Sequence, residues 1–207
     1  MSSSFHLQPV IEFYGFDAES SCPWEIAEIT GFEWIRLSAE MSQSEIGLFF
    51  AQLAVYNQID LSENREAILK EILEADGLAL AGGIQAVFEE QVISPSCCCG
   101  LEGWREWQDF LKTNETPWLG HDPSPWIEQV DDVIRIWSDG GLGDSMKDAF
   151  KIEVNRSAFE RELQAVERDL LGFRFCIESW CQSLGFEQAS ELAEKIKRCF
   201  QLDQRYL

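Results

Sequence analysis

Hydrophobic residues recur with a helical period near the C-terminus. Eight large apolar side chains are spaced alternately four and three residues apart, a heptad pattern that predicts one long helix. Ser157 and Glu160 match a capping box at its start, and Gly185 suits its C-terminal end. A second apolar stripe over residues 192–200 predicts another helix, so residues 151–207 are expected to form a helical hairpin. The heptad residues are Phe159, Leu163, Val166, Leu170, Phe173, Ile177, Trp180 and Leu184.

Shorter patterns in residues 1–150 mix strands with helices. Two segments, 10–16 and 32–37, alternate aromatic or β-branched residues with polar ones, as half-exposed strands do. Apolar residues repeat every three or four positions over 46–54 and again over 68–73, which predicts two amphipathic helices. The chain is therefore predicted to be α+β, with a small, mostly antiparallel sheet covered by helices and a C-terminal helical hairpin.

The middle of the chain alternates short elements and turns. Strands are expected at 78–81 and 86–93, separated by Gly82–Gly83. A short helix is expected over 100–112. After a proline-rich loop, residues 126–137 carry two β-branched runs around a pair of aspartates, which predicts a hairpin without a glycine in its turn.

Charge is spread unevenly along the chain. There are 37 acidic and 16 basic residues, a formal net charge of −21. Residues 1–150 hold 27 of the acidic residues and seven of the basic ones, whereas residues 151–207 are close to balanced. We divide the chain into an acidic α+β domain, 1–150, and a helical hairpin, 151–207, packed on it as one folding unit. Such a polyanion repels nucleic acid and anionic membranes and associates faster with basic partners.

The sequence also indicates a compartment. Its N-terminus lacks the basic and apolar regions of a signal peptide, and no apolar run approaches the roughly 20 residues that a membrane span needs. Seven cysteines without a secretory signal do not suggest a disulfide framework. We therefore expect a cytoplasmic protein without a membrane partner.

The residues best suited to chemistry are concentrated in residues 93–141. This segment holds five of the eight tryptophans, three consecutive cysteines and one of the two histidines, His121. In an extended segment Cys97 and Cys99 would share a face while Cys98 pointed away. A zinc site formed by Cys97, Cys99 and His121 is therefore a candidate, although the repeated Cys-x₂₋₄-Cys spacing of structural zinc sites is absent.

A nucleophilic cysteine is the second chemical interpretation of this segment. A helix beginning near Gly100 would place Cys98 or Cys99 at its N-terminus, where backbone N–H groups favour a thiolate. His121 and Asp122 would then serve as base and orienting group. Alternatively, these thiols fill gaps in the core and the histidine caps a turn. No cofactor other than zinc is suggested.

A non-catalytic binding module is the function that the charge distribution favours. Its acidic face would recognise a basic protein partner; bacterial immunity proteins, which neutralise toxins, are similar in size and charge alone. A DNA mimic that inhibits a nucleic-acid-binding protein is an alternative, whereas the shortage of basic residues argues against direct nucleic-acid binding. The heptad seam is expected to pack internally, with self-association as the alternative, so a monomer or weak homodimer is predicted. The candidate binding residues are Trp118, His121, Asp122, Trp126, Asp131, Asp132 and Asp139.

Overall fold

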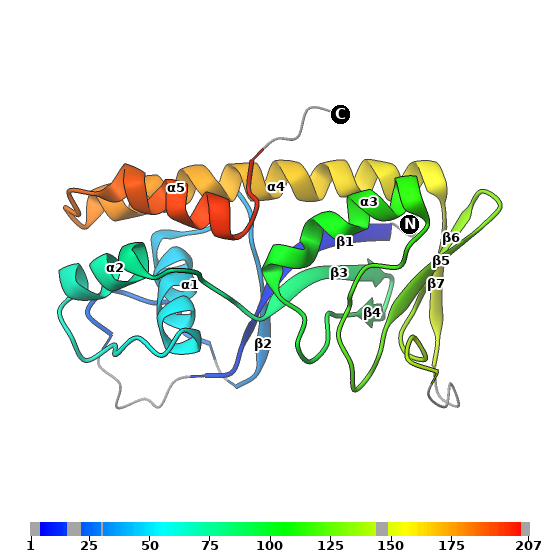
Figure 1. Ribbon diagram of the computed structural model, residues 1–207, viewed down its shortest axis with the longest axis horizontal. Coiled ribbons are helices and arrows are strands. Elements are labelled where there is room, and N and C mark those ends of the chain that lie inside the picture. The colour runs from blue at the N-terminus through cyan, green and yellow to red at the C-terminus, as the bar shows by residue number, and fades with distance from the viewer. Residues whose placement is uncertain (1–4, 16–21, 30, 144–148, 204–207) are drawn as a thin grey trace. The chain divides into compact units, whose positions relative to one another are not determined.

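The protein has an α+β fold. The computed structural model describes residues 5–15, 22–29, 31–143 and 149–203 of the chain. These residues form five α-helices and two antiparallel sheets (Figure 1). The predicted fold class, including the C-terminal pair of helices, is confirmed.

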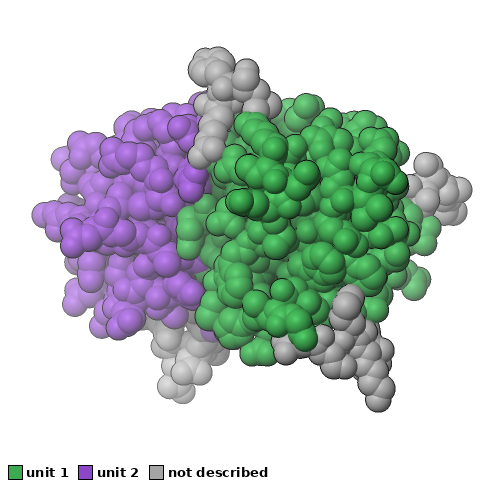
Figure 2. All heavy atoms as spheres, turned by 45° about the vertical axis from the view of Figure 1, so that its right-hand side comes forward, with its two compact units in different colours: residues 1–10, 81–168 green, residues 11–80, 169–207 purple. Residues whose placement is uncertain are grey.

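The chain folds into two compact units, each built from two separate stretches of sequence (Figure 2). Strand β1 (Phe5–Phe13) and helix α4 (Arg156–Ser183) each contribute residues to both units. From the sequence we expect residues 1–150 and the helical hairpin, 151–207, to fold cooperatively as one unit. This stays a prediction. Unit 1 consists of residues 1–10 and 81–168, and unit 2 of residues 11–80 and 169–207.

One sheet has four strands in the order β2-β1-β3-β4. Its strands β3 and β4 form a hairpin that pairs Ala86 with Ile93 and turns at Glu89, whose φ is 56°. The prediction of two separate strands, at 78–81 and 86–93, is therefore wrong. The strand β3 begins at Gly82, after the first range, and the chain reverses direction within the second range. Besides β1, the strands are β2 (Glu33–Arg36), β3 (Gly82–Phe88) and β4 (Gln91–Ile93).

The other sheet belongs to unit 1 and has three antiparallel strands in sequential order. The predicted hairpin forms its first two strands, and Asp131 adopts a φ of 55° in the turn where a glycine is more usual. The third strand was not predicted from the sequence. The strands are β5 (Trp126–Val130), β6 (Val133–Trp137) and β7 (Lys151–Asn155).

The helices follow the predicted apolar stripes. The Ser42 side chain caps α1 by accepting a hydrogen bond from the Glu45 N–H. The Asn64 side chain caps α2 by accepting one from the Ala67 N–H. The expected helix over 100–112 begins with a 3₁₀ turn at Leu101–Arg105. None of the described helices is both long and apolar enough to cross a bilayer. Besides α4, the helices are α1 (Gln43–Tyr56), α2 (Arg65–Glu74), α3 (Glu106–Thr113) and α5 (Ala189–Cys199).

The heptad seam lies inside the protein. Its first seven residues, from Phe159 to Trp180, are each at most 2% exposed, and the left-handed Gly185 follows the end of α4. The N-terminal cap differs from the prediction, since the Asn155 side chain, rather than that of Ser157, accepts from the Ala158 N–H at 2.8 Å. In unit 2, α5 runs back along α4 (Figure 1).

Candidate metal centre

Two loops of unit 1 run antiparallel and carry the candidate site. One follows β4 and the other follows α3. The Ser96 N–H donates to the Leu119 carbonyl at 2.9 Å, and the His121 N–H donates to the Cys97 carbonyl at 3.1 Å. The Ser96 hydroxyl also donates to the His121 carbonyl at 2.8 Å. This pairing holds Cys97 directly opposite His121.

Glycines allow the loops to approach so closely. Gly120 has a φ of +96°, and a Cβ placed there would lie 2.5 Å from the carbonyl carbon of Ser96. Gly83 on β3 faces the first loop, and its Cβ would lie 3.1 Å from Pro95 and 3.3 Å from the Cys99 sulfur. Glycine within a strand often marks such a close approach. The sequence suggested that Gly82 and Gly83 separate two strands, but they are the first two residues of β3.

The backbone at Cys98 decides which cysteines meet. Its φ is 65°, so the segment is not extended there and adjacent side chains need not point to opposite sides. The Sγ atoms of Cys97 and Cys98 lie 3.5 Å apart, and both residues are exposed. The structure thus places Cys98, rather than the expected Cys99, beside Cys97 and His121.

Cys99 has a different role. Its side chain is buried, and its thiol donates to the Trp118 carbonyl at 3.5 Å. Burial, reinforced by the charges of Glu102 and Glu106, raises the pKa of the Cys99 thiol to about 12. A neutral, buried thiol behaves as a small apolar side chain.

His121 links the two sulfurs to a carboxylate. Its Nδ1 lies 2.9 Å from an Asp122 oxygen, and this hydrogen bond, followed by one with Cys98, raises the pKa of the imidazole. Hydrogen bonds from Cys97 and His121 lower the pKa of the Cys98 thiol. The ligand atoms of Cys97, Cys98 and His121 all lie within 4.8 Å of one another. Trp118 borders this group, because its indole N–H donates to the Cys98 carbonyl at 3.0 Å.

The other candidate binding residues lie elsewhere in unit 1. Trp126 stacks on Trp137 across the β5–β6 pair, with ring centroids 5.9 Å apart. Asp131 and Asp132 form the turn of that hairpin. Asp139 accepts hydrogen bonds from the Ser124 and Gly140 N–H groups. Of the seven predicted binding residues, the structure therefore gathers Trp118, His121 and Asp122 around the cysteines.

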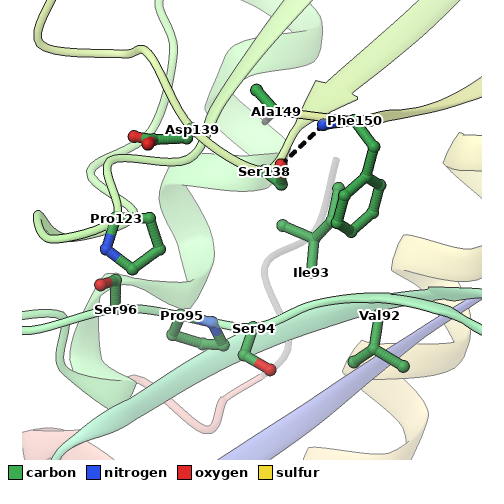
Figure 3. Close-up of a pocket in the computed structure, with 10 residues that line it drawn as sticks. All are labelled: Val92, Ile93, Ser94, Pro95, Ser96, Pro123, Ser138, Asp139, Ala149 and Phe150. Carbon is green, nitrogen blue, oxygen red and sulfur yellow. Dashed lines mark hydrogen bonds between the residues drawn. The ribbon is translucent and has the colours of Figure 1, made fainter. Parts of the chain in front are cut away.

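A pocket of about 480 Å³ lies next to these loops (Figure 3). Its walls include Ile93, Pro95 and Phe150, and Figure 3 shows the hydrogen bond from the Phe150 N–H to the Ser138 hydroxyl. Ser96 and Pro123 also line it, and they adjoin Cys97 and Asp122 in the chain. The pocket therefore adjoins the two loops, but Cys97, Cys98 and His121 do not line it.

No protein-family model, curated protein or solved structure matches this chain.

Proposed function

We propose that the protein binds one zinc ion through Cys97, Cys98 and His121, with a fourth coordination position left open. One observation carries this proposal: the three ligand atoms lie within 4.8 Å of one another, with the two sulfurs 3.5 Å apart. Tetrahedral zinc, with Zn–S near 2.3 Å and Zn–N near 2.0 Å, requires ligand separations of roughly 3.6–3.8 Å. Thiolate and imidazole are also the ligands that zinc prefers.

The contact between His121 and Asp122 supports the same assignment. Metal-binding histidines usually donate their second ring N–H to a carboxylate, which fixes the tautomer and the orientation of the ring. Here Nδ1 bonds to the Asp122 carboxylate at 2.9 Å, which leaves Nε2 for the ion. Asp122 is thus a positioning residue for His121.

Three protein ligands favour a chemical role for the zinc over a purely structural one. Structural zinc sites are usually closed by four protein ligands, whereas catalytic sites keep one position for water or substrate. Both cysteines are exposed, and the pocket lined by Ser96 and Pro123 adjoins the loops that carry them. Zinc-bound water has a pKa near 7, so it can act as a nucleophile at neutral pH. We therefore propose a zinc-dependent activity whose substrate reaches the ion from solvent, on the exposed side of Cys97 and Cys98.

Zinc titration of the reduced, chelator-stripped protein tests this proposal. Native mass spectrometry should show one zinc per chain, and the adduct should disappear in Cys98→Ala and in His121→Ala. Cys176→Ala is the matched control, because Cys176 lies in unit 2, and it should retain the ion. Cys99→Ala should retain it as well.

Three outcomes would overturn the proposal. The first is wild-type protein that takes up no zinc. The second is loss of zinc in Cys99→Ala but not in Cys98→Ala, which would restore the ligand set expected from the sequence. The third is selective alkylation of Cys98 by iodoacetamide near pH 6 at a rate that added zinc does not slow, which would assign the site to thiol chemistry instead.

A further inference from the structure

Three aromatic side chains of unit 2, Tyr14, Phe32 and Trp34, form a cluster that we call the aromatic surface. The Phe32 ring centroid lies 5.9 Å from that of Tyr14 and 5.8 Å from that of Trp34, both in edge-to-face arrangements. Tyr14 is 60% exposed and Phe32 is 55% exposed, whereas Phe49 and Phe50 of the same unit are fully buried. The cluster is therefore not part of the core of the unit.

Ring contacts join Phe32, just before β2, to Tyr14, just after β1, and to Trp34. Phe13 at the end of β1 is buried, so the next residue, Tyr14, points to the other side. On the neighbouring strand β2, Ile35 is buried and the half-buried Trp34 points to the opposite side, where Phe32, just before the strand, packs edge-to-face against it. The two adjacent strands therefore present their aromatic residues together.

The surroundings of the aromatic surface are acidic. The Tyr14 hydroxyl donates to the Glu12 carboxylate. Glu33, which lies between Phe32 and Trp34 in the chain, is exposed, and Arg36 is the one basic residue within two positions of these rings in the sequence. That arginine is already paired with Asp169 of the same unit at 2.7 Å. Unit 2 as a whole has 20 acidic and eight basic residues, so a cation approaching these rings meets a negative field.

We propose that the aromatic surface binds arginine or lysine side chains of a basic protein partner. Cations are attracted to the faces of aromatic rings within about 6 Å of the centroid, and Arg and Lys are the side chains that use this contact. The Glu12 carboxylate adds an acceptor for their N–H groups. A second copy of this chain is a poor occupant, because two molecules that each carry a net charge of −21 repel one another. The proposal does not depend on the zinc site.

The test uses a fluorescein-labelled dodecapeptide of alternating arginine and glycine as the probe. Its affinity is measured by fluorescence anisotropy in 50 mM salt. Phe32→Ala should weaken binding about fivefold, as expected for the loss of one cation–π contact. Phe32→Leu should weaken it similarly, because leucine keeps an apolar side chain but has no π face. Phe175→Ala is the matched control, since Phe175 is a 66% exposed phenylalanine of the same unit, and it should bind like the wild type.

Each contrary result identifies a different explanation. Equal affinities for wild type, Phe32→Ala and Phe175→Ala would show diffuse electrostatic attraction and would overturn the proposal. Wild-type affinity in Phe32→Leu would show an apolar contact rather than a cation site. Concentration-dependent dimers that Phe32→Ala abolishes would assign the surface to a second copy of the chain. Circular dichroism and zinc binding of each variant confirm that the fold is intact and separate these outcomes from failure of the zinc site.

Discussion

Single backbone conformations decide which side chains meet at the candidate metal centre. Cys98 at φ 65° turns its sulfur towards Cys97, and Asp122 at φ 58° holds its carboxylate against His121. Neither residue is a glycine, so residue type did not single out either position, although aspartate adopts a positive φ more often than most other residues. Gly120 is the exception, because only glycine fits its position opposite Ser96.

We expect Gly120→Ala to destabilise the protein. The left-handed φ alone costs about 1–2 kcal/mol for a residue with a Cβ, and the clash with the Ser96 backbone adds to this. Urea unfolding measures the effect. Gly103→Ala is the control, since its Cβ would meet nothing closer than 3.9 Å. Equal unfolding free energies for the two variants would contradict the predicted clash.

We expect Asp122→Asn to weaken zinc binding about 10–100-fold, as is typical when the carboxylate behind a metal-binding histidine is lost. Asparagine tolerates the left-handed backbone, so the loop should keep its shape. A competition titration with a chromogenic chelator measures the affinity. Asp131→Asn, another aspartate at positive φ in unit 1, should bind zinc as the wild type does. Unchanged affinity in Asp122→Asn would remove Asp122 from the site.

At the scale of elements, caps and loop anchors mark where each helix or strand begins and ends. The sequence pattern places the start of α4 correctly to within a few residues. It assigns the cap to Ser157, whereas the preceding strand β7 places Asn155 at that position. Asp139 similarly anchors the loop after β6 through hydrogen bonds from Ser124 and Gly140.

The cap assignment is testable with two alanine variants. Asn155→Ala should lower the unfolding free energy by about 1 kcal/mol, because the Ala158 N–H loses its acceptor. Ser157→Ala should change it much less, since the Ser157 hydroxyl donates to the Asn155 side chain instead of capping the helix. Thermal and urea unfolding compare the variants. A larger loss in Ser157→Ala would favour the capping box expected from the sequence.

The Asp139 anchor should make stability depend on pH. Hydrogen bonds from the backbone of Ser124 and Gly140 lower the pKa of this carboxyl. The ionised carboxylate stabilises the folded state fully above the unfolded-state pKa of about 3.9. This stabilisation is lost as pH falls through the lower folded-state pKa. The wild type should therefore be more stable than Asp139→Asn at pH 7, and the difference should shrink as pH falls below the unfolded-state pKa and through the lower folded-state pKa. A difference in melting temperature that stays constant with pH would contradict this.

At the scale of the whole molecule, the heptad seam is internal and the charge is strongly negative. Because the first seven seam residues are at most 2% exposed, they are not available for a coiled coil between chains. We expect sedimentation to give a monomer of about 24 kDa at micromolar concentration. A stable dimer that persists at high salt would contradict this expectation, because salt screens the repulsion but does not expose the seam.

Elements with local sequence signals were predicted correctly. The period of the apolar residues located α1, α2 and α4, and the alternation around Asp131 located the β5–β6 hairpin. These predictions succeeded because a helix or a hairpin buries a stripe or face that neighbouring residues define. The α+β class followed from the order of those elements.

Contacts between residues distant in the sequence depend on the fold and were not predictable from local patterns. The fold selected Cys98 over Cys99, placed Gly83 inside β3 and gathered Tyr14, Phe32 and Trp34 into one cluster. Each of these depends on a contact between separate segments or on a left-handed backbone at a residue other than glycine. Sequence periodicity reports which face of an element is apolar. It does not report which segment packs against that face, and the candidate metal centre depends on that packing.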